Sequence, residues 1–426
     1  MKKAISRCAL LALIGCFPPA PGWGRELWRD ADGGQSLIFK SSFKGDWEQP
    51  LSIPGSPASQ GEAVAFGRLR LEPEGNINDE LKAGLTWDLK GWLTPAMVTS
   101  NLLPNAAPGF FRLTAGGSQH TQDHLSWQQE LDRAWVAYQP ESGNFTLGRQ
   151  AIGWGRGALF SAVDIFVPFS PWEVDQQWRR GVDALRGDFK LTNKISLDLV
   201  AAPGTNPLIP DSPVTLNDSA LAARLRGDLG TWDAELVAGR RGQDRLAGFT
   251  ASLPLGDLEM HGEAAVFLAP GDVPDAGLGG NPNLVPKILC GVSNHFPLGQ
   301  GLTVAVEYHY SGFGVSDIRT LPERRNEPAY LLRYARGDSQ IPGKQAWAFQ
   351  GIYALNEWWQ TGLNVLQSAT DNSGFLAPSL DWNFTENITL LATGLWAYGR
   401  PAEGGIPQSQ FGNSTPTWLV QVRIYD

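Results

Sequence analysis

Cysteine is nearly absent from this 426-residue chain, and its scarcity removes several classes of site. Only three cysteines occur, and two of them, Cys8 and Cys16, lie close to the N-terminus. Cys290 is the single cysteine in the rest of the chain. A disulfide framework, a covalent haem attachment motif and a cysteine-based metal site are therefore excluded for residues beyond the N-terminal segment.

Charge and long apolar runs are also scarce. Charged residues make up 18% of the chain, the net charge is −9, and no basic run interrupts that balance. This composition argues against binding to nucleic acid. Beyond the N-terminal segment no apolar run reaches the roughly 18 residues that a membrane-spanning helix needs.

The N-terminal segment has the pattern of a secretory signal peptide, which we predict to span residues 1–24. Lys2, Lys3 and Arg7 precede the apolar stretch "CALLALIGCF", and small residues suited to cleavage follow it. The apolar stretch is too short to cross a bilayer. The sequence Leu-Ile-Gly-Cys, which ends at Cys16, also fits a lipoprotein box, and this alternative would leave Cys16 acylated.

The rest of the chain is dominated by alternation with a period of two residues. In "ELKAGLTWDLK", Leu85, Trp87 and Leu89 share one face, whereas Asp88 and Lys90 share the other. Such alternation is typical of strands with one apolar and one polar face. It fits a soluble sandwich as well as a membrane barrel, so the strands alone do not decide the fold.

The lengths of the connections do decide it. We predict eighteen strands, with sixteen as the alternative, at residues 36–45, 63–73, 79–90, 131–139, 144–153, 181–191, 194–202, 219–229, 231–240, 244–254, 257–268, 286–297, 301–312, 345–355, 357–367, 374–384, 387–398 and 417–425. Every connection after an even-numbered strand is tight. Most of those after odd-numbered strands are long, namely 46–62, 91–130, 154–180, 203–218, 269–285, 313–344 and 399–416.

This sorting predicts an all-β fold, a transmembrane antiparallel up-and-down β-barrel with short periplasmic turns and long extracellular loops. The barrel would be a single domain of residues 25–426 in the outer membrane of a Gram-negative bacterium, with the lipid bilayer as its partner. Closure follows because lipid cannot satisfy the hydrogen bonds of an open sheet edge. We expect aromatic residues near strand ends to form interfacial girdles: Trp47, Trp154, Trp232, Tyr310, Trp347, Trp358, Tyr398 and Trp418.

The loop at 154–180 is too apolar to extend into water. We therefore predict that it folds into the barrel, where a lumen is expected at this strand number, and packs its aromatic residues on the inner wall. Its carboxylates would then narrow the pore. The predicted constriction consists of Asp164, Glu173, Asp175, Phe166, Phe169 and Trp172. The alternative is a loop that caps the rim without touching the permeation path.

The segment around this loop resembles a known group of proteins. Gly148, Arg149, Gln150, Trp154, Gly155, Asp164, Pro168, Arg180, Gly181, Asp183 and Arg186 match, over about 40 residues, a segment of Gram-negative outer-membrane porin-like barrels, including alginate-export-type barrels. The resemblance implies an outer-membrane barrel and names no substrate. Such barrels usually end in an aromatic residue, whereas here Tyr425 precedes a final Asp426.

Alternation also places many charges on the inner wall. The set that we single out comprises Arg68, Arg70, Arg133, Arg149, Arg180, Arg186, Arg224, Arg226, Asp233 and Glu235. One interpretation is that opposite charges on neighbouring strands neutralise one another and stiffen the wall. The other is a transverse field, between loop carboxylates and wall arginines, that orients solutes in the pore.

The function that these features favour is a porin-like channel for diffusion of small polar solutes, without enzymatic activity, cofactor or metal. A homo-oligomer is compatible with the sequence, which does not determine the number of subunits. The first alternative is the barrel sheath of a cell-surface complex such as an electron conduit, which would need a separate haem partner. An outer-membrane enzyme is a weaker alternative, resting on His261 with Glu259 and Glu263, or on His120 and His124 as metal ligands. Adhesion through Arg336-Gly337-Asp338 is weaker still.

Overall fold

The structure is a computed structural model. It describes residues 25–32, 34–51, 63–93, 111–113, 117–122, 124–171, 173, 176–206, 209, 212–271, 273, 277–278 and 281–426. The predicted signal peptide, residues 1–24, lies outside the described residues.

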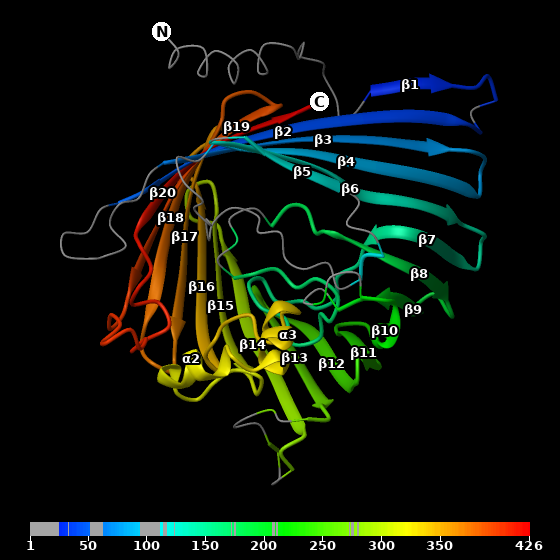
Figure 1. Ribbon diagram of the computed structural model, residues 1–426. Helices are drawn as coiled ribbons and strands as arrows, with labels where there is room; N and C mark the ends of the chain where they lie inside the picture. The colour runs from blue at the N-terminus through cyan, green and yellow to red at the C-terminus, as the bar shows by residue number, and fades with distance from the viewer. Residues whose placement is uncertain are drawn as a thin grey trace.

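Eighteen antiparallel strands form a closed barrel, which confirms the predicted fold and strand number (Figure 1). Each strand pairs with the next, and β20 pairs with β2 to close the sheet. The strands are β2 (Ser36–Pro50), β3 (Val64–Asn76), β4 (Leu81–Leu93), β6 (Leu125–Tyr138), β7 (Gly143–Ala151), β8 (Gly181–Lys190), β9 (Ile195–Gly204), β10 (Thr215–Asp228), β11 (Asp233–Arg241), β12 (Asp244–Leu255), β13 (Leu258–Leu268), β14 (Leu284–Phe296), β15 (Leu302–Ser311), β16 (Gln345–Ala354), β17 (Trp359–Ser368), β18 (Gly374–Asn383), β19 (Ile388–Tyr398) and β20 (Thr417–Tyr425).

Two further strands lie outside the predicted set. β1 (Arg25–Arg29) pairs with the start of β2, and β5 (Gly117–Gln122) pairs with the first half of β6. The loop between β15 and β16 contains η1 (Ile318–Thr320), α2 (Leu321–Arg324) and α3 (Pro328–Ala335). Among the described residues, no helix is both long and apolar enough to cross a membrane.

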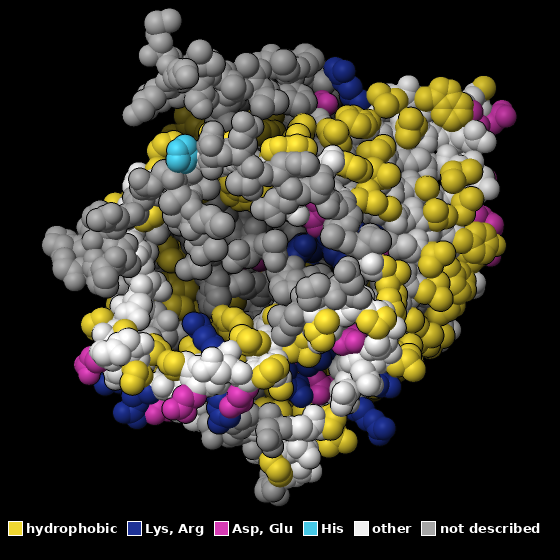
Figure 2. Space-filling model, in the orientation of Figure 1, with side chains coloured by type: hydrophobic (Ala, Val, Ile, Leu, Met, Phe, Trp, Pro, Cys, Tyr) yellow, Lys and Arg dark blue, Asp and Glu magenta, His cyan; other side chains and the backbone are white. Residues whose placement is uncertain are grey.

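The two faces of the barrel differ in the way that the alternation predicts. Leu147, Leu221 and Leu236 on the outer face are 65%, 65% and 57% exposed, whereas Asp88 and Asp198 on the inner face are fully buried. Figure 2 shows apolar side chains covering the outside of the strands on the right-hand side of the barrel. An apolar outer face and a polar inner face are what a membrane barrel requires, because its outer surface contacts lipid.

Most of the predicted girdle residues lie on the outer face. Trp47, Trp232, Trp347, Trp358, Tyr398 and Trp418 are among the exposed large side chains. The assignment of Trp154 to the girdle is wrong. Trp154 is 3% exposed and belongs to the apolar cluster inside the barrel. It follows the end of β7, where the chain turns inward, so the alternation of the strand no longer applies to it.

Candidate functional site

The loop between β7 and β8 folds into the barrel and packs on its inner wall (Figure 1). The rings of Trp154 and Phe166 meet edge to face, with centroids 5.1 Å apart, and Ile165 is buried beside them. Because the facing wall side chains are small, the loop can approach closely. They are Val182, Ala184, Val200, Ala202, Ala220, Ala222, Val237 and Ala265.

Wall carboxylates hold the backbone of this loop. Glu263 of β13 accepts hydrogen bonds from five loop donors: the backbone N–H groups of Arg156, Gly157 (3.0 Å), Ala162 (2.7 Å) and Val163 (3.3 Å), and the Ser161 hydroxyl (2.9 Å). Hydrogen bonds to an ionised acceptor are stronger than neutral ones, so this one side chain fixes two stretches of the loop.

Glu307 of β15 anchors the intervening residues. Its oxygens accept from the N–H groups of Ala158 and Leu159, at 2.5 and 3.1 Å, and lie 2.9 Å from His261 Nε2. The turn requires glycine at Gly155, where φ is +106° and a Cβ would lie 2.3 Å from the Ser161 hydroxyl. The loop is thus shaped by its own sequence and held by the wall.

A second loop, 313–344, packs against the first. Gln340 joins them, since its Oε1 accepts from Ser161 N at 2.9 Å and its Nε2 donates to Phe169 O at 2.8 Å. Asp338 is buried with Arg241 and lies 2.7 Å from Arg336. Burial alone would raise the pKa of Asp338, but Arg241, Arg336 and Arg333 lower it to about 2. Asp338 of the Arg-Gly-Asp tripeptide is therefore buried in a network of ion pairs, which argues against adhesion through the tripeptide.

The structure places the predicted constriction residues as follows. Asp164 is 2% exposed and pairs with Arg179. Burial raises the pKa of Asp164, and this effect is larger than the lowering by the positive charge of Arg179. Phe166 is buried against the wall, and the Phe169 ring lies 4.6 Å from the Arg179 guanidinium. Glu173 lines a cavity of the lumen. Trp172 and Asp175 lie outside the described residues.

One cluster of wall charges surrounds Asp88 and Asp132. Arg70 is fully buried, and its Nη1 lies 3.1 Å from Asp88 Oδ1 and 3.0 Å from Asp132 Oδ2. Arg68 also pairs with Asp88, and Arg133 lies 3.8 Å from Asp132. Opposite charges on neighbouring strands are thus in direct contact at this part of the wall.

A second cluster joins the strands on either side of Asp198. Arg186 and Arg224 each lie 2.9 Å from its carboxylate, and Arg224 also lies 3.6 Å from Glu235. Arg226 pairs with Asp188 at 2.5 Å. The remaining predicted wall charges pair in the same way or line a cavity: Arg149 lies 2.8 Å from Asp183, Arg180 lies 3.2 Å from Glu130, and Asp233 lines the turn end of the lumen.

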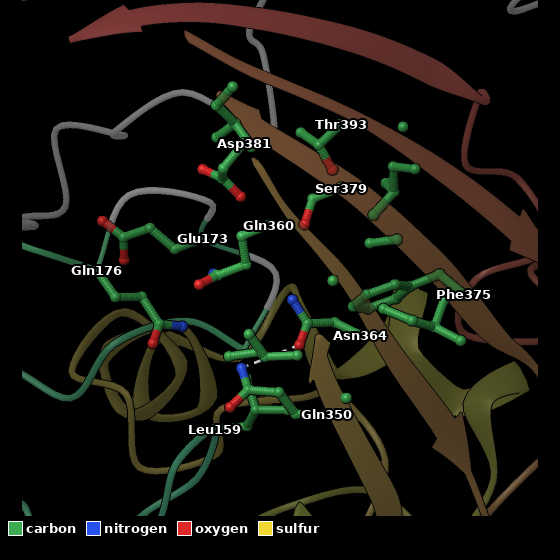
Figure 3. A pocket seen from close by; sticks show the side chains of 18 of the residues that line it. Leu159, Glu173, Gln176, Gln350, Gln360, Asn364, Phe375, Ser379, Asp381 and Thr393 are labelled. Atoms are coloured by element: carbon green, nitrogen blue, oxygen red, sulfur yellow. Dashed lines mark hydrogen bonds between the residues drawn. The ribbon is translucent and has the colours of Figure 1, made fainter. Parts of the chain in front are cut away.

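Among the cavities lined by described residues, two lie on the lumen side of the wall. The larger, about 1300 Å³, is at the turn end of β6–β11 and is lined by charged residues that include Arg156, Lys190, Lys194 and Arg226. The smaller, about 290 Å³, lies between the inward loop and β16–β20 (Figure 3). The inward loop packs mainly on β8–β14. Its Leu159 and Phe160 also contact the apolar cluster of β14 and β16–β18, and space is left between the rest of the loop and β16–β20.

Several residues important to this arrangement are absent from the predicted site. Alternation along β13 and β15 can place Glu263 and Glu307 on the lumen face. It does not reveal which residues of another segment reach them. Trp178 is a further case. The Lys44 Nζ lies 3.6 Å from the centre of its ring, and the Arg68 and Arg70 guanidinium carbons lie 4.8 and 5.1 Å away. Cation–π contacts of this kind leave no sequence signal at such separations.

Comparison with known proteins supports the fold. No family model matches the chain, and no curated protein matches it. Its structure is similar to OccAB1 of Acinetobacter baumannii, with a TM-score of 0.57 and 8% identity over 96% of this chain and 99% of that one. OccAB3 of the same organism matches with a TM-score of 0.54 and 10% identity over 92% of this chain and 99% of that one. OccK11 (OpdR) of Pseudomonas aeruginosa matches with a TM-score of 0.53 and 8% identity over 91% of this chain and 95% of that one.

At these identities the likeness is one of fold. A closed barrel with an apolar outer face, sharing its architecture with barrels of Gram-negative bacteria over nearly its whole length, belongs in the outer membrane. The chain is an outer-membrane β-barrel.

Proposed function

We propose that the chain is a porin-like channel through which small polar solutes diffuse across the outer membrane. The observation that carries the proposal is the pair of polar cavities inside the barrel, which remain beside a loop packed on only part of the wall. A polar lumen in a closed barrel is what passage of water-soluble molecules requires.

The inward loop would set the size limit of this channel. We retain Glu173, Phe169, Trp172 and Asp175 as constriction residues, and assign Asp164 and Phe166 the task of holding the loop, because both are buried. The paired wall arginines would act mainly by stiffening the barrel. Kinship with alginate-export-type barrels and assembly into homo-oligomers remain predictions.

The alternatives are less well supported by the contacts inside the barrel. A sheath needs a lumen free for its partner, whereas two loops occupy the lumen side of β8–β14. For an enzyme, His261 would need to be available, yet its Nε2 is bonded to Glu307, which also holds the loop backbone. The side chain of His120 lies outside the described residues.

Single-channel recording in a planar bilayer tests the proposal. We expect the purified barrel to give steady conductance steps, and the reversal potential in a salt gradient to report the sign of its ion preference. A well-folded barrel that gives no conductance, with ions or with uncharged solutes, would contradict the proposal and favour the sheath.

A further inference from the structure

The smaller cavity has a chemical character unlike the rest of the lumen. Its wall presents side-chain amides and hydroxyls from β16–β19, which Figure 3 shows around one space: Gln350, Gln360, Asn364, Ser379 and Thr393. The inward loop faces them with Leu159, Pro171, Glu173 and Gln176.

These polar groups retain hydrogen-bonding capacity for a ligand. Gln350 Nε2 donates to Asn364 Oδ1 at 3.0 Å, and the Thr393 hydroxyl donates to Pro378 O at 2.9 Å. A primary amide offers two donors and two acceptor sites, so a single bond between two amides leaves most of their capacity available. Gly362 leaves room for the Ser379 hydroxyl, since a Cβ there would lie 2.6 Å from it.

Charge is nearly missing from this side of the barrel. No lysine or arginine occurs between Lys344 and Arg400. The four strands β16–β19, all of them described, contain one charged side chain, Asp381, which lies 3.9 Å from Arg423 of β20. These two groups offset one another, whereas β3–β15 carry the dense charge clusters of the opposite wall.

Apolar surface lies next to the amides. Phe375, Leu391 and Leu395 line the same cavity, together with Leu159 of the loop. A sugar ring presents the complementary pattern, with C–H groups on its faces and hydroxyls around its edge. The remaining charge of the lining is Glu173 of the loop. An anion would therefore lose water of hydration here without finding an uncompensated positive charge, and a cation would find a single carboxylate.

We propose that this cavity is a subsite for a neutral, hydroxyl-rich solute of about the size of one sugar ring, and that such solutes pass along the β16–β20 wall. The inference rests on the proposed channel function and names its substrate class. The amides and hydroxyls of the cavity form hydrogen bonds to the solute that replace those to its hydration water. The apolar residues cover the face of its ring. The clusters of charged residues lie on the other side of the barrel, where they pair with one another or hold the loops.

Uptake of three ring-matched probes into proteoliposomes tests the inference: glucose, glucuronate and glucosamine, which differ in charge. We expect glucose to enter several-fold faster than either charged probe. The variant Asn364→Leu should lower the glucose rate roughly fivefold, the equivalent of about 1 kcal/mol for one hydrogen bond, without lowering ion conductance. Gln408→Leu, an amide of the loop 399–416 that does not line the cavity, is the matched control.

The outcomes separate the two proposals. Ion conductance with glucose entering no faster than the charged probes would overturn the subsite and leave the channel standing. Equal loss of glucose uptake in Asn364→Leu and Gln408→Leu would also overturn the subsite. A folded barrel that passes neither ions nor glucose would overturn both.

Discussion

Removal of the Glu263 carboxylate should release the inward loop while the barrel stays closed. Five loop donors converge on this side chain, and four of them are backbone N–H groups. A buried donor left without a partner costs about 1–3 kcal/mol. Water that enters the vacated space offsets part of that cost, so we expect Glu263→Ala to weaken loop docking by about 3–5 kcal/mol, the range for breaking a buried charged network.

A change of this size raises the undocked fraction of the loop by a factor of roughly 10² to 4 × 10³. Limited trypsin digestion of the protein in liposomes reads this directly, because the loop contains Arg156, Arg179 and Arg180. We expect cleavage at these residues in Glu263→Ala and noisy, larger current steps in a bilayer. The barrel should still migrate as a folded species in unheated gels, since no strand pairing is lost.

The matched control is Glu259→Gln. Glu259 lies four residues earlier on the same face of β13 and is exposed in the lumen. It should leave both the digestion pattern and the current unchanged. If Glu263→Ala resists trypsin as well as Glu259→Gln does, the carboxylate does not anchor the loop and the reasoning fails.

Three further predictions follow from the same contacts. Because the folded pKa of Asp338, about 2, lies below the ordinary value of 3.8, its stabilising contribution is complete above about pH 4 and is lost as pH falls toward 2. Thermal unfolding from pH 6 to pH 2 should show this loss, and Asp338→Asn should abolish it. Glu173→Gln should shift the reversal potential toward anions more than Asp164→Asn does, because Glu173 lines a cavity and Asp164 is buried beside Arg179; equal shifts would refute this. Trp154→Ala should destabilise loop packing by about 3–5 kcal/mol, measured by the same digestion, and unchanged protection would refute it.

The strands were predictable because two independent signals agree. Alternation with period two marks each strand, and the lengths of the connections identify which end faces the periplasm. β6 shows the limit of the method, since it begins at Leu125, six residues before the predicted start at 131. The added residues pair with β4 and with β5, whose sequence "GSQHTQ" has no apolar alternation to reveal it.

The loop contacts were predictable only in outline. The apolar residues of 154–180 indicate that the loop must find an apolar surface, and the small wall residues supply it. Which wall residues hold it could not be predicted, because Glu263 is separated from its loop partners by about a hundred positions. Loop 313–344 contacts the first loop through Gln340 and the wall through Asp338. The types of both residues suit an exposed loop equally well.

We propose that solutes pass beside the β16–β20 wall, whereas the inward loop packs mainly on β8–β14. Single-channel recording with a thiol-reactive reagent tests it, in a Cys290→Ser background. Current through Ser379→Cys should fall when the reagent is added, because Ser379 lines the open cavity. Current through Ala222→Cys should not change, because Ala222 is buried under the loop. Block at Ala222→Cys without block at Ser379→Cys would contradict the account.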